Sequence, residues 1–148
     1  MVKEDDISKH IMHEEEYSVS QQSLNSIETA RKTGRKIVAV GTTSCRVLET
    51  LANKTMGGVA PAALNSDRAT PPADSFPKNI CDTTNIFIYP GYVFQWTDVL
   101  LTNFHLPQST LLMLVYAFGS SSLMKRVYQE AIFQKYRFYS YGDAMLII

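Results

Sequence analysis

The stretch TNFHLPQSTLLMLVYAF, residues Thr102–Phe118, sets a polar cluster directly before a wholly apolar run. Pro107 disfavours helical geometry at Leu106, so the polar cluster is predicted to be a turn that follows a strand. The apolar run Leu111–Phe118 carries no charge on any side and must be buried. At this length, periodicity does not separate an enclosed helix from an inner strand, and we favour a helix.

The polar residues of this stretch are candidates for chemistry. Ser109 or Asn103 could cap the predicted helix, whose free N–H groups would then face an anion directly behind His105. His105 can act as an acid or a base near neutral pH. The plainer alternative is a capped core helix with a surface histidine. The candidates for substrate contact in this stretch are Asn103, His105, Ser109 and Thr110.

Length and charge bound the class of protein. The chain has 148 residues, 45% of them hydrophobic, which is enough for the core of one domain spanning residues 1–148. Lys and Arg together number 14, as do Asp and Glu, so the formal net charge is zero. No overall electrostatic field therefore draws the chain toward nucleic acid or membrane. Cys45 and Cys81 are too few for a disulfide scaffold, and the charged start has no apolar leader. We therefore expect a soluble, cytoplasmic protein without a membrane helix.

Near the start, the block HIMHEE brings His10, His13 and Glu14 together. The two histidines are three positions apart and would share one face of a helix. A zinc shell completed by His105 is one interpretation, but no CxxC or HExxH spacing supports it. We expect a hydrogen-bonding role and no metal.

The segment Tyr17–Val19 is predicted to be a short strand, followed by a helix that ends near Thr33 with Gly34 just beyond it. Cations surround the end of this helix. A solvated face is the simpler interpretation, and contact with phosphates is the functional one. These cations are Arg31, Lys32, Arg35 and Lys36.

The apolar run Ile37–Gly41 suits a central strand of an α/β sheet. Three hydroxyl residues follow it, Thr42, Thr43 and Ser44, and an amphipathic helix begins there. Glycine, hydroxyls and a helix N-terminus at the end of a strand form an anion cradle, in which Arg46 could clamp a carboxylate or phosphate. The alternative is a well-capped turn between a strand and a helix.

Residues 55–83 shift to Gly, Pro, Ala, Ser, Asn and Asp without periodicity, which predicts a long surface loop. The segment Asn85–Tyr89 is predicted to resume the sheet, and Tyr92–Trp96 and Asp98–Phe104 to add two strands. The predicted fold class is therefore α/β, a layered sheet flanked by helices.

The C-terminal part begins with a run of serines after Gly119, which is predicted to cap the clearest amphipathic helix of the chain. Asp143 then stands between Gly142 and a final apolar strand. Among Phe138, Tyr139 and Tyr141, its carboxylate could hold a cation by charge and by the ring quadrupoles. An acid that closes a β-turn is the alternative.

Five blocks together carry a resemblance that none of them carries alone. They are HIMHEE (10–15), IVAVGTTSCRVLE (37–49), IFIYPGYVF (86–94), LLTNFHLPQSTLLMLV (100–115) and YRFYSYGDAMLI (136–147). In these blocks the sequence resembles the S-adenosylmethionine:tRNA ribosyltransferase-isomerase family of queuosine biosynthesis. Family members are much longer, and the chain resembles only their C-terminal part, as an incomplete portion of a larger α/β domain without the inserted β-barrel domain.

The resemblance implies transfer of the ribosyl group of S-adenosylmethionine to an aminomethyl-deazaguanine at the tRNA wobble position. The product is epoxyqueuosine, and adenine and methionine leave. We hypothesise that His105 and Asp143 are catalytic, that Thr42–Arg46 hold a carboxylate, and that the cations near Gly34 contact tRNA. Two alternatives remain, a non-catalytic tRNA-binding module and an inactive fragment of the longer enzyme. The implied partners are tRNA, S-adenosylmethionine, and either the missing N-terminal part or a second copy.

Overall fold

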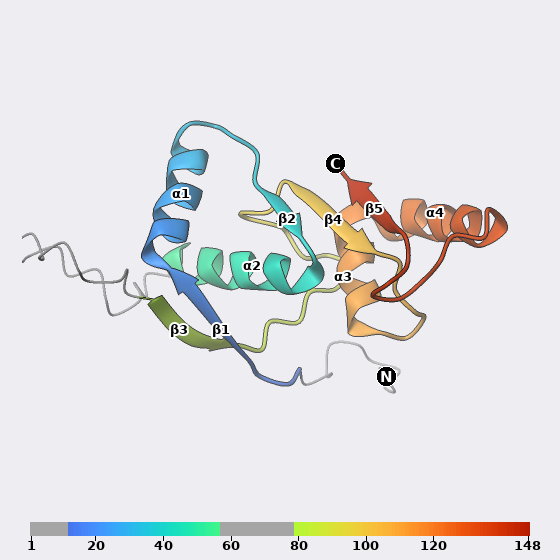
Figure 1. The fold of residues 1–148 in the computed structure, drawn as a ribbon, viewed down its shortest axis with the longest axis horizontal. Helices are drawn as coiled ribbons and strands as arrows, with labels where there is room; N and C mark the ends of the chain where they lie inside the picture. The colour runs from blue at the N-terminus through green and yellow to red at the C-terminus, as the bar shows by residue number, and fades with distance from the viewer. Residues whose placement is uncertain (1–11, 57–78) are drawn as a thin grey trace, which may run out of the picture.

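The computed structural model describes residues 12–56 and 79–148. Within these residues the chain has a mixed α/β fold, with helices alternating with strands of two small sheets (Figure 1). The elements are β1 (Glu15–Ser20), α1 (Gln21–Lys32), β2 (Val38–Val40), α2 (Thr42–Met56), β3 (Asn79–Thr84), β4 (Val99–Asn103), α3 (Thr110–Gly119), α4 (Ser121–Phe133) and β5 (Ala144–Ile147).

The larger sheet has the order β2-β4-β5. β2 runs parallel to β4 with Ala39 opposite Leu100, and β5 runs antiparallel to β4 with Ile147 opposite the same Leu100. The smaller sheet is the antiparallel pair of β1 and β3, in which Tyr17 lies opposite Asp82. The predicted α/β class is confirmed.

The main core lies on one face of the larger sheet. Ala39, Leu100 and Ile147 alternate with outward residues along their strands and point into this core. Helices α2, α3 and α4 supply most of the other buried side chains of the cluster, and Ile88 and Phe104 come from segments outside the helices and strands. The helix-contributed members are Cys45, Leu112, Leu114, Val115, Met124, Tyr128 and Ala131.

The apolar run after the polar cluster is a helix, as predicted. Ser109 caps α3, because its Oγ accepts the backbone N–H of Leu112 at 3.1 Å. Leu112, Leu114 and Val115 are buried, and the other positions between 111 and 118 are half-buried.

A second, smaller core joins α1 to α2 through Leu24, Leu51 and Trp96. Ser20 caps α1 by accepting the N–H of Ser23, and Gly34 takes a positive φ of 67° just past the helix end. The predicted strand, helix and C-terminal glycine of this region are confirmed.

A buried acid, Glu49 on α2, fixes the chain that leads into β4. Its Oε1 accepts the backbone N–H groups of Trp96 and Thr97 at 3.1 and 2.9 Å. Its Oε2 accepts the N–H of Gln95 at 2.8 Å and the hydroxyl of Tyr92 at 3.1 Å. A buried carboxylate needs such donors, and they hold residues 92–97 outside any strand.

Several expected elements are wrong. Residues 85–89 and 92–96 are not strands; β3 lies earlier, at Asn79–Thr84, inside the segment expected to be loop. The first part of that segment belongs to α2, and residues 57–78 lie outside the described chain. β3 was missed because its pattern is mostly polar and it faces β1 rather than the main core.

Two further differences concern β2 and α4. β2 is an edge strand in the described part of the chain, whereas its apolar run predicted a central one. Helix α4 follows Ser120, but no side-chain hydrogen bond caps it there, because Ser120 has a φ of 61°. In the part of the chain that the structure describes, every helix is too short or too polar to cross a membrane.

Candidate functional site

Three of the predicted motifs meet at one edge of the larger sheet. β2 and β4 are parallel, so their C-terminal ends lie on the same side, where α2 begins and the polar cluster follows β4 (Figure 1). β5 is antiparallel and starts at that edge, with Ala144 opposite Asn103. Ligands of open α/β sheets bind outside the C-terminal ends of the strands, so this edge is the candidate site.

His105 is held at this edge by contacts on two sides. Its Nε2 lies 2.9 Å from Oγ1 of the buried Thr102, and its backbone N–H donates to the hydroxyl of Tyr128 at 3.1 Å. The ring is half-buried, and burial lowers its pKa below the ordinary 6.5. The imidazole is therefore neutral near pH 7 and can accept a proton.

The turn between β4 and α3 has little freedom. Gln108 has a positive φ of 58°, and the hydroxyl of Ser109 donates to the carbonyl of Leu106 at 2.8 Å. Because Ser109 also caps α3, both hydrogen bonds of its hydroxyl are made within the turn and the first turn of the helix. Thr110 is half-buried as the first residue of the helix.

Asp143 closes a tight loop with Arg137. Its carboxylate accepts the backbone N–H of Arg137 at 2.7 Å and the guanidinium at 2.9 Å. The guanidinium holds the pKa of the Asp143 carboxyl below its usual range, so the group is ionised at neutral pH. A Cβ on Gly142 would lie 2.3 Å from the carbonyl oxygen of Arg137, so only glycine fits this loop.

Asn103 joins this loop to β4. Its amide nitrogen lies 3.3 Å from the carbonyl oxygen of Gly142 and 3.4 Å from that of Asp143. Tyr141, by contrast, is 99% exposed, while Phe138 packs on Phe104 with ring centroids 5.3 Å apart. The contacts of Asp143 within the described chain are those of an acid that closes a turn, the role weighed as an alternative.

The expected anion cradle forms the start of α2. Gly41 has a φ of 88°, and α2 begins immediately after it at Thr42. Thr42 is buried, whereas Thr43 and Ser44 are exposed at the helix start. The first-turn N–H groups of a helix lack intrahelical partners, so they and the two hydroxyls can receive an anion.

Arg46 is buried one turn into α2. Its Nη1 pairs with Glu15 at 2.6 Å, and its Nε donates to the carbonyl of Ile86 at 3.2 Å. Its Nη2 is buried and has no hydrogen-bond partner among the described residues. The pair brings Glu15, the last residue of the first family block, next to the start of α2.

The other predicted residues lie elsewhere. His13 and Glu14 are exposed just before β1, and His10 lies outside the described residues.

The four cations are at the opposite edge of the sheet, where the chain enters β2. Arg31 stacks over Trp96 at 5.3 Å and donates to the carbonyl of Gln95, and Lys32 pairs with Glu28 at 3.6 Å. Within residues 12–56 and 79–148, no three His, Cys, Asp or Glu side chains form a metal-binding group.

Sequence reasoning missed Thr102, Tyr128, Arg137 and Glu49. The first three are the direct partners of His105 and Asp143. Arg137 lies only six positions before Asp143, so the sequence itself could have indicated this ion pair. Tyr128 is 23 positions from His105. Its place in the apolar pattern of the predicted amphipathic helix indicated only a core residue.

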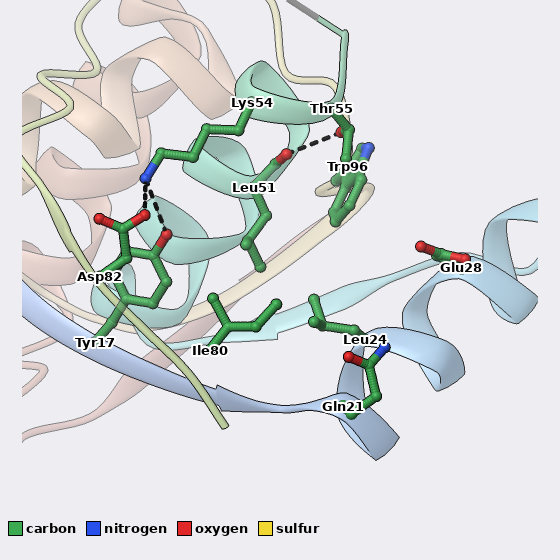
Figure 2. A pocket seen from close by; sticks show the side chains of 10 residues that line it. All are labelled: Tyr17, Gln21, Leu24, Glu28, Leu51, Lys54, Thr55, Ile80, Asp82 and Trp96. Atoms are coloured by element: carbon green, nitrogen blue, oxygen red, sulfur yellow. Dashed lines mark hydrogen bonds and ion pairs between the residues drawn. The ribbon is translucent and has the colours of Figure 1, made fainter. Parts of the chain in front are cut away.

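Figure 2 shows a cavity away from this edge, between α1, α2 and the smaller sheet. Lys54 forms an ion pair with Asp82 on one side of it and lies 3.4 Å from the hydroxyl of Tyr17, and Leu24 and Trp96 line the other side. Its volume of about 30 Å³ has room for water but not for a nucleoside. It is a gap in the second core rather than a substrate site.

The fold and the site together define an α/β protein with a polar site at the C-terminal edge of its sheet. A family model described as queuosine biosynthesis protein matches residues 1–147. The chain belongs to this family, that of the S-adenosylmethionine:tRNA ribosyltransferase-isomerases.

Its relatives include two enzymes of that name. One from Thermoanaerobacter is 46% identical over 147 residues, which are 99% of this chain and 38% of the relative. One from Polynucleobacter asymbioticus is 46% identical over 146 residues, which are 35% of the relative. A solved S-adenosylmethionine tRNA ribosyltransferase from Thermotoga maritima is 40% identical, with a TM-score of 0.71 over 90% of this chain and 40% of that one. The chain therefore spans well under half the length of the proteins it matches.

Proposed function

We propose that the chain forms one wall of an active site that transfers the ribosyl group of S-adenosylmethionine to an aminomethyl-deazaguanine at the tRNA wobble position. The sugar isomerises, epoxyqueuosine forms, and adenine and methionine leave. The main support is the meeting of three family blocks at one sheet edge, after β2, after β4 and before β5. S-adenosylmethionine is the ribosyl donor, and the proposal requires no metal.

His105 is the proposed acid and base. It is neutral near pH 7 because burial lowers its pKa, and Thr102 and Tyr128 fix the ring at the edge of the sheet. It can take a proton beside the sulfonium and return it to departing adenine. General acid or base catalysis contributes about 10²- to 10⁴-fold to rate.

The start of α2 is the proposed clamp for the methionine carboxylate. Thr43 and Ser44 offer exposed hydroxyls there, and the helix offers free N–H groups. The Nη2 of Arg46, which lacks a partner in the described chain, is a further donor, while Nη1 stays on Glu15. His13 and Glu14 stand just before Glu15 and are assigned to the same substrate-binding wall, and His10 is assigned to it from the family block alone.

Asp143 is the proposed anionic group that faces the sulfonium, together with Tyr141. Arg137 keeps the carboxylate ionised and fixed, and Asn103 ties the loop to β4. Ser109 and Thr110 shape the turn next to it. Because Tyr141 is free on the surface, its ring can close over a bound cation.

The tRNA is proposed to contact the cations near Gly34. Arg35 and Lys36 are exposed, whereas Arg31 is occupied by Trp96 and Gln95. Neutralising Arg35 and Lys36 together should lower the slope of log affinity against log salt by about 1 to 2. An unchanged slope would assign the two side chains to solvent.

A second candidate function is tRNA binding without catalysis, or no activity at all. It is considered because a base, an acid and two clamps need a closed pocket, and the described residues supply one wall of such a pocket. In that case tRNA affinity would not respond to S-adenosylmethionine.

The deciding experiment is single-turnover adenine release from S-adenosylmethionine with hypomodified tRNA. The chain is tested alone and joined by a flexible linker to the part of the Thermoanaerobacter relative outside the aligned 38%. We expect release only from the joined protein, and a roughly 10²- to 10⁴-fold slower rate with His105→Gln at unchanged tRNA affinity. A joined protein that melts cooperatively but releases no adenine would contradict the proposal.

A further inference from the structure

The two ring nitrogens of His105 have different neighbours. Nε2 lies 2.9 Å from Oγ1 of Thr102, within hydrogen-bond distance. Among the described residues, Nδ1 makes no hydrogen bond with the protein. The ring is half-buried, so one of its sides is open to a ligand. The fold therefore distinguishes the nitrogen that the protein holds from the nitrogen that a substrate can reach.

Thr102 is a fixed partner for Nε2. It lies on β4, the central strand of the larger sheet, opposite Met145 of β5. Its side chain shares a face with Leu100, two positions earlier, and only 4% of the residue is exposed. A buried hydroxyl without a hydrogen-bond partner is costly, and a β-branched side chain has few rotamers. The Thr102 hydroxyl is thus held against the ring.

The backbone of His105 is held from another direction. Its N–H donates to the hydroxyl of Tyr128 at 3.1 Å, and the Tyr128 ring packs edge-on against Phe104 with centroids 5.4 Å apart. A half-turn of the imidazole about Cβ–Cγ would place the carbon Cε1 where Nε2 lies and would break the bond to Thr102. The backbone contact and the ring contact together define one orientation of the imidazole.

A hydroxyl is a suitable partner for a ring that must change its protonation state. Oγ1 has two lone pairs, so it can accept from Nε2–H in both the neutral and the charged imidazole. Because the hydroxyl is neutral, it orients the ring without holding it in the charged form, as a carboxylate would. When Nε2 carries the proton, the lone pair of the neutral ring lies on Nδ1.

We propose that Thr102 is a positioning residue that accepts Nε2–H of His105 and so makes Nδ1 the nitrogen that exchanges protons with the substrate. The chemistry rests on the proposed function. The C–H bond beside the sulfonium breaks, its electron pair stays on the carbon, and the proton binds Nδ1. The same proton then passes from Nδ1 to the adenine nitrogen that receives the electron pair of the broken glycosidic bond. Nε2 keeps its proton on Thr102 throughout.

The first test is a nitrogen-15 NMR spectrum of the histidine side chains in the chain itself. The three histidines are assigned by single His→Gln substitutions. In the neutral ring of His105 we expect the proton on Nε2 and not on Nδ1. Thr102→Val removes the hydroxyl and keeps the side-chain shape. It should move the tautomer ratio about fivefold toward that of the exposed His13, because one hydrogen bond is lost, and Thr102→Ser should restore the parent ratio.

Thr97→Val is the matched control. Thr97 is also buried, but its Oγ1 lies 3.6 Å from Sγ of Cys45 and does not contact His105. It should leave the His105 signals unchanged. An equal shift with both variants would overturn the proposal. So would a parent spectrum in which His105 has its proton on Nδ1 or matches His13, and this result needs no variant that folds.

The second test is single-turnover adenine release in the joined protein. Thr102→Val should slow release by about ten- to a hundredfold at unchanged tRNA affinity, because the base loses its alignment. Thr102→Ser should recover most of the rate, and Thr97→Val should match the parent. A changed tautomer ratio with an unchanged rate would overturn the role of Nδ1. If the joined parent releases no adenine, the proposed function fails, whereas the spectrum of the chain still decides whether Thr102 holds Nε2.

Discussion

The two faces of the β2-β4-β5 sheet are made by alternate residues of the same strands, yet they have different surroundings. On one face, Leu100 is fully buried under the helices that follow β2 and β4. On the other, Leu146 and Val40 are apolar and more than half exposed. The strands are therefore patterned for burial on two sides, and the described chain covers the second face only in part, at Val99 opposite Val38. The candidate site lies at the C-terminal ends of β2 and β4, where both faces of the sheet end.

The largest expected difference comes from truncating one leucine on each face. Leu100→Ala should lower the free energy of unfolding by about 2 to 5 kcal/mol, because it opens a cavity in a closed core. Leu146→Ala should cost less than about 1 kcal/mol, because its side chain already meets water. Urea unfolding measures both. Similar losses would mean that the Leu146 side chain is covered in the isolated chain.

Removing the buried acid behind the covered face should have the next largest effect. Glu49→Ala should cost about 2 to 4 kcal/mol, because it leaves three backbone N–H groups and the Tyr92 hydroxyl without their acceptor. Glu130→Ala, on the exposed side of α4, should change stability by less than about 0.5 kcal/mol. If the thermal melts of the two variants coincide, Glu49 does not have this structural role.

The two serine caps should differ by a smaller amount. Ser109→Ala should cost about 1 kcal/mol, because the N–H of Leu112 loses its partner. Ser120 makes no side-chain cap and has a φ of 61°, so Ser120→Gly should be neutral or stabilise by up to about 1 kcal/mol. Guanidinium unfolding compares them. A loss at Ser120 as large as that at Ser109 would contradict this assignment.

The smallest expected effect is a pH dependence at the site edge. Burial lowers the pKa of His105, so the unfolded chain binds its proton more tightly than the folded chain. This contribution to stability is complete above the unfolded value of 6.5 and is lost as the pH falls from there toward the folded pKa. Melts between pH 5 and pH 8 should show a shallower acid decline for His105→Gln, measured at roughly 0.5-unit steps. A parallel decline in both proteins would mean that His105 titrates as if exposed.

Local features could be predicted from the sequence because they depend on neighbours within one turn. Pro107 and Ser109 ended one element and capped the next, and Gly34 supplied the positive φ beyond α1. The apolar run Leu111–Phe118 was long and uncharged, so only a buried helix or strand could accommodate it. The five family blocks then indicated which polar residues belong together.

Tertiary structure alone decided which strands exist and which faces are covered. Residues 85–89 are more apolar than β3, yet β3 is the strand, because its backbone pairs with β1, whose paired residues lie 59 to 69 positions away. Glu49 receives donors from 43 to 48 positions away, and Arg46 pairs with Glu15, contacts that no local pattern encodes. The sequence of β2 determined that both its faces are apolar. Which face is buried depends on the polypeptide packed against it, because hydrophobic burial is non-directional and requires only an available partner.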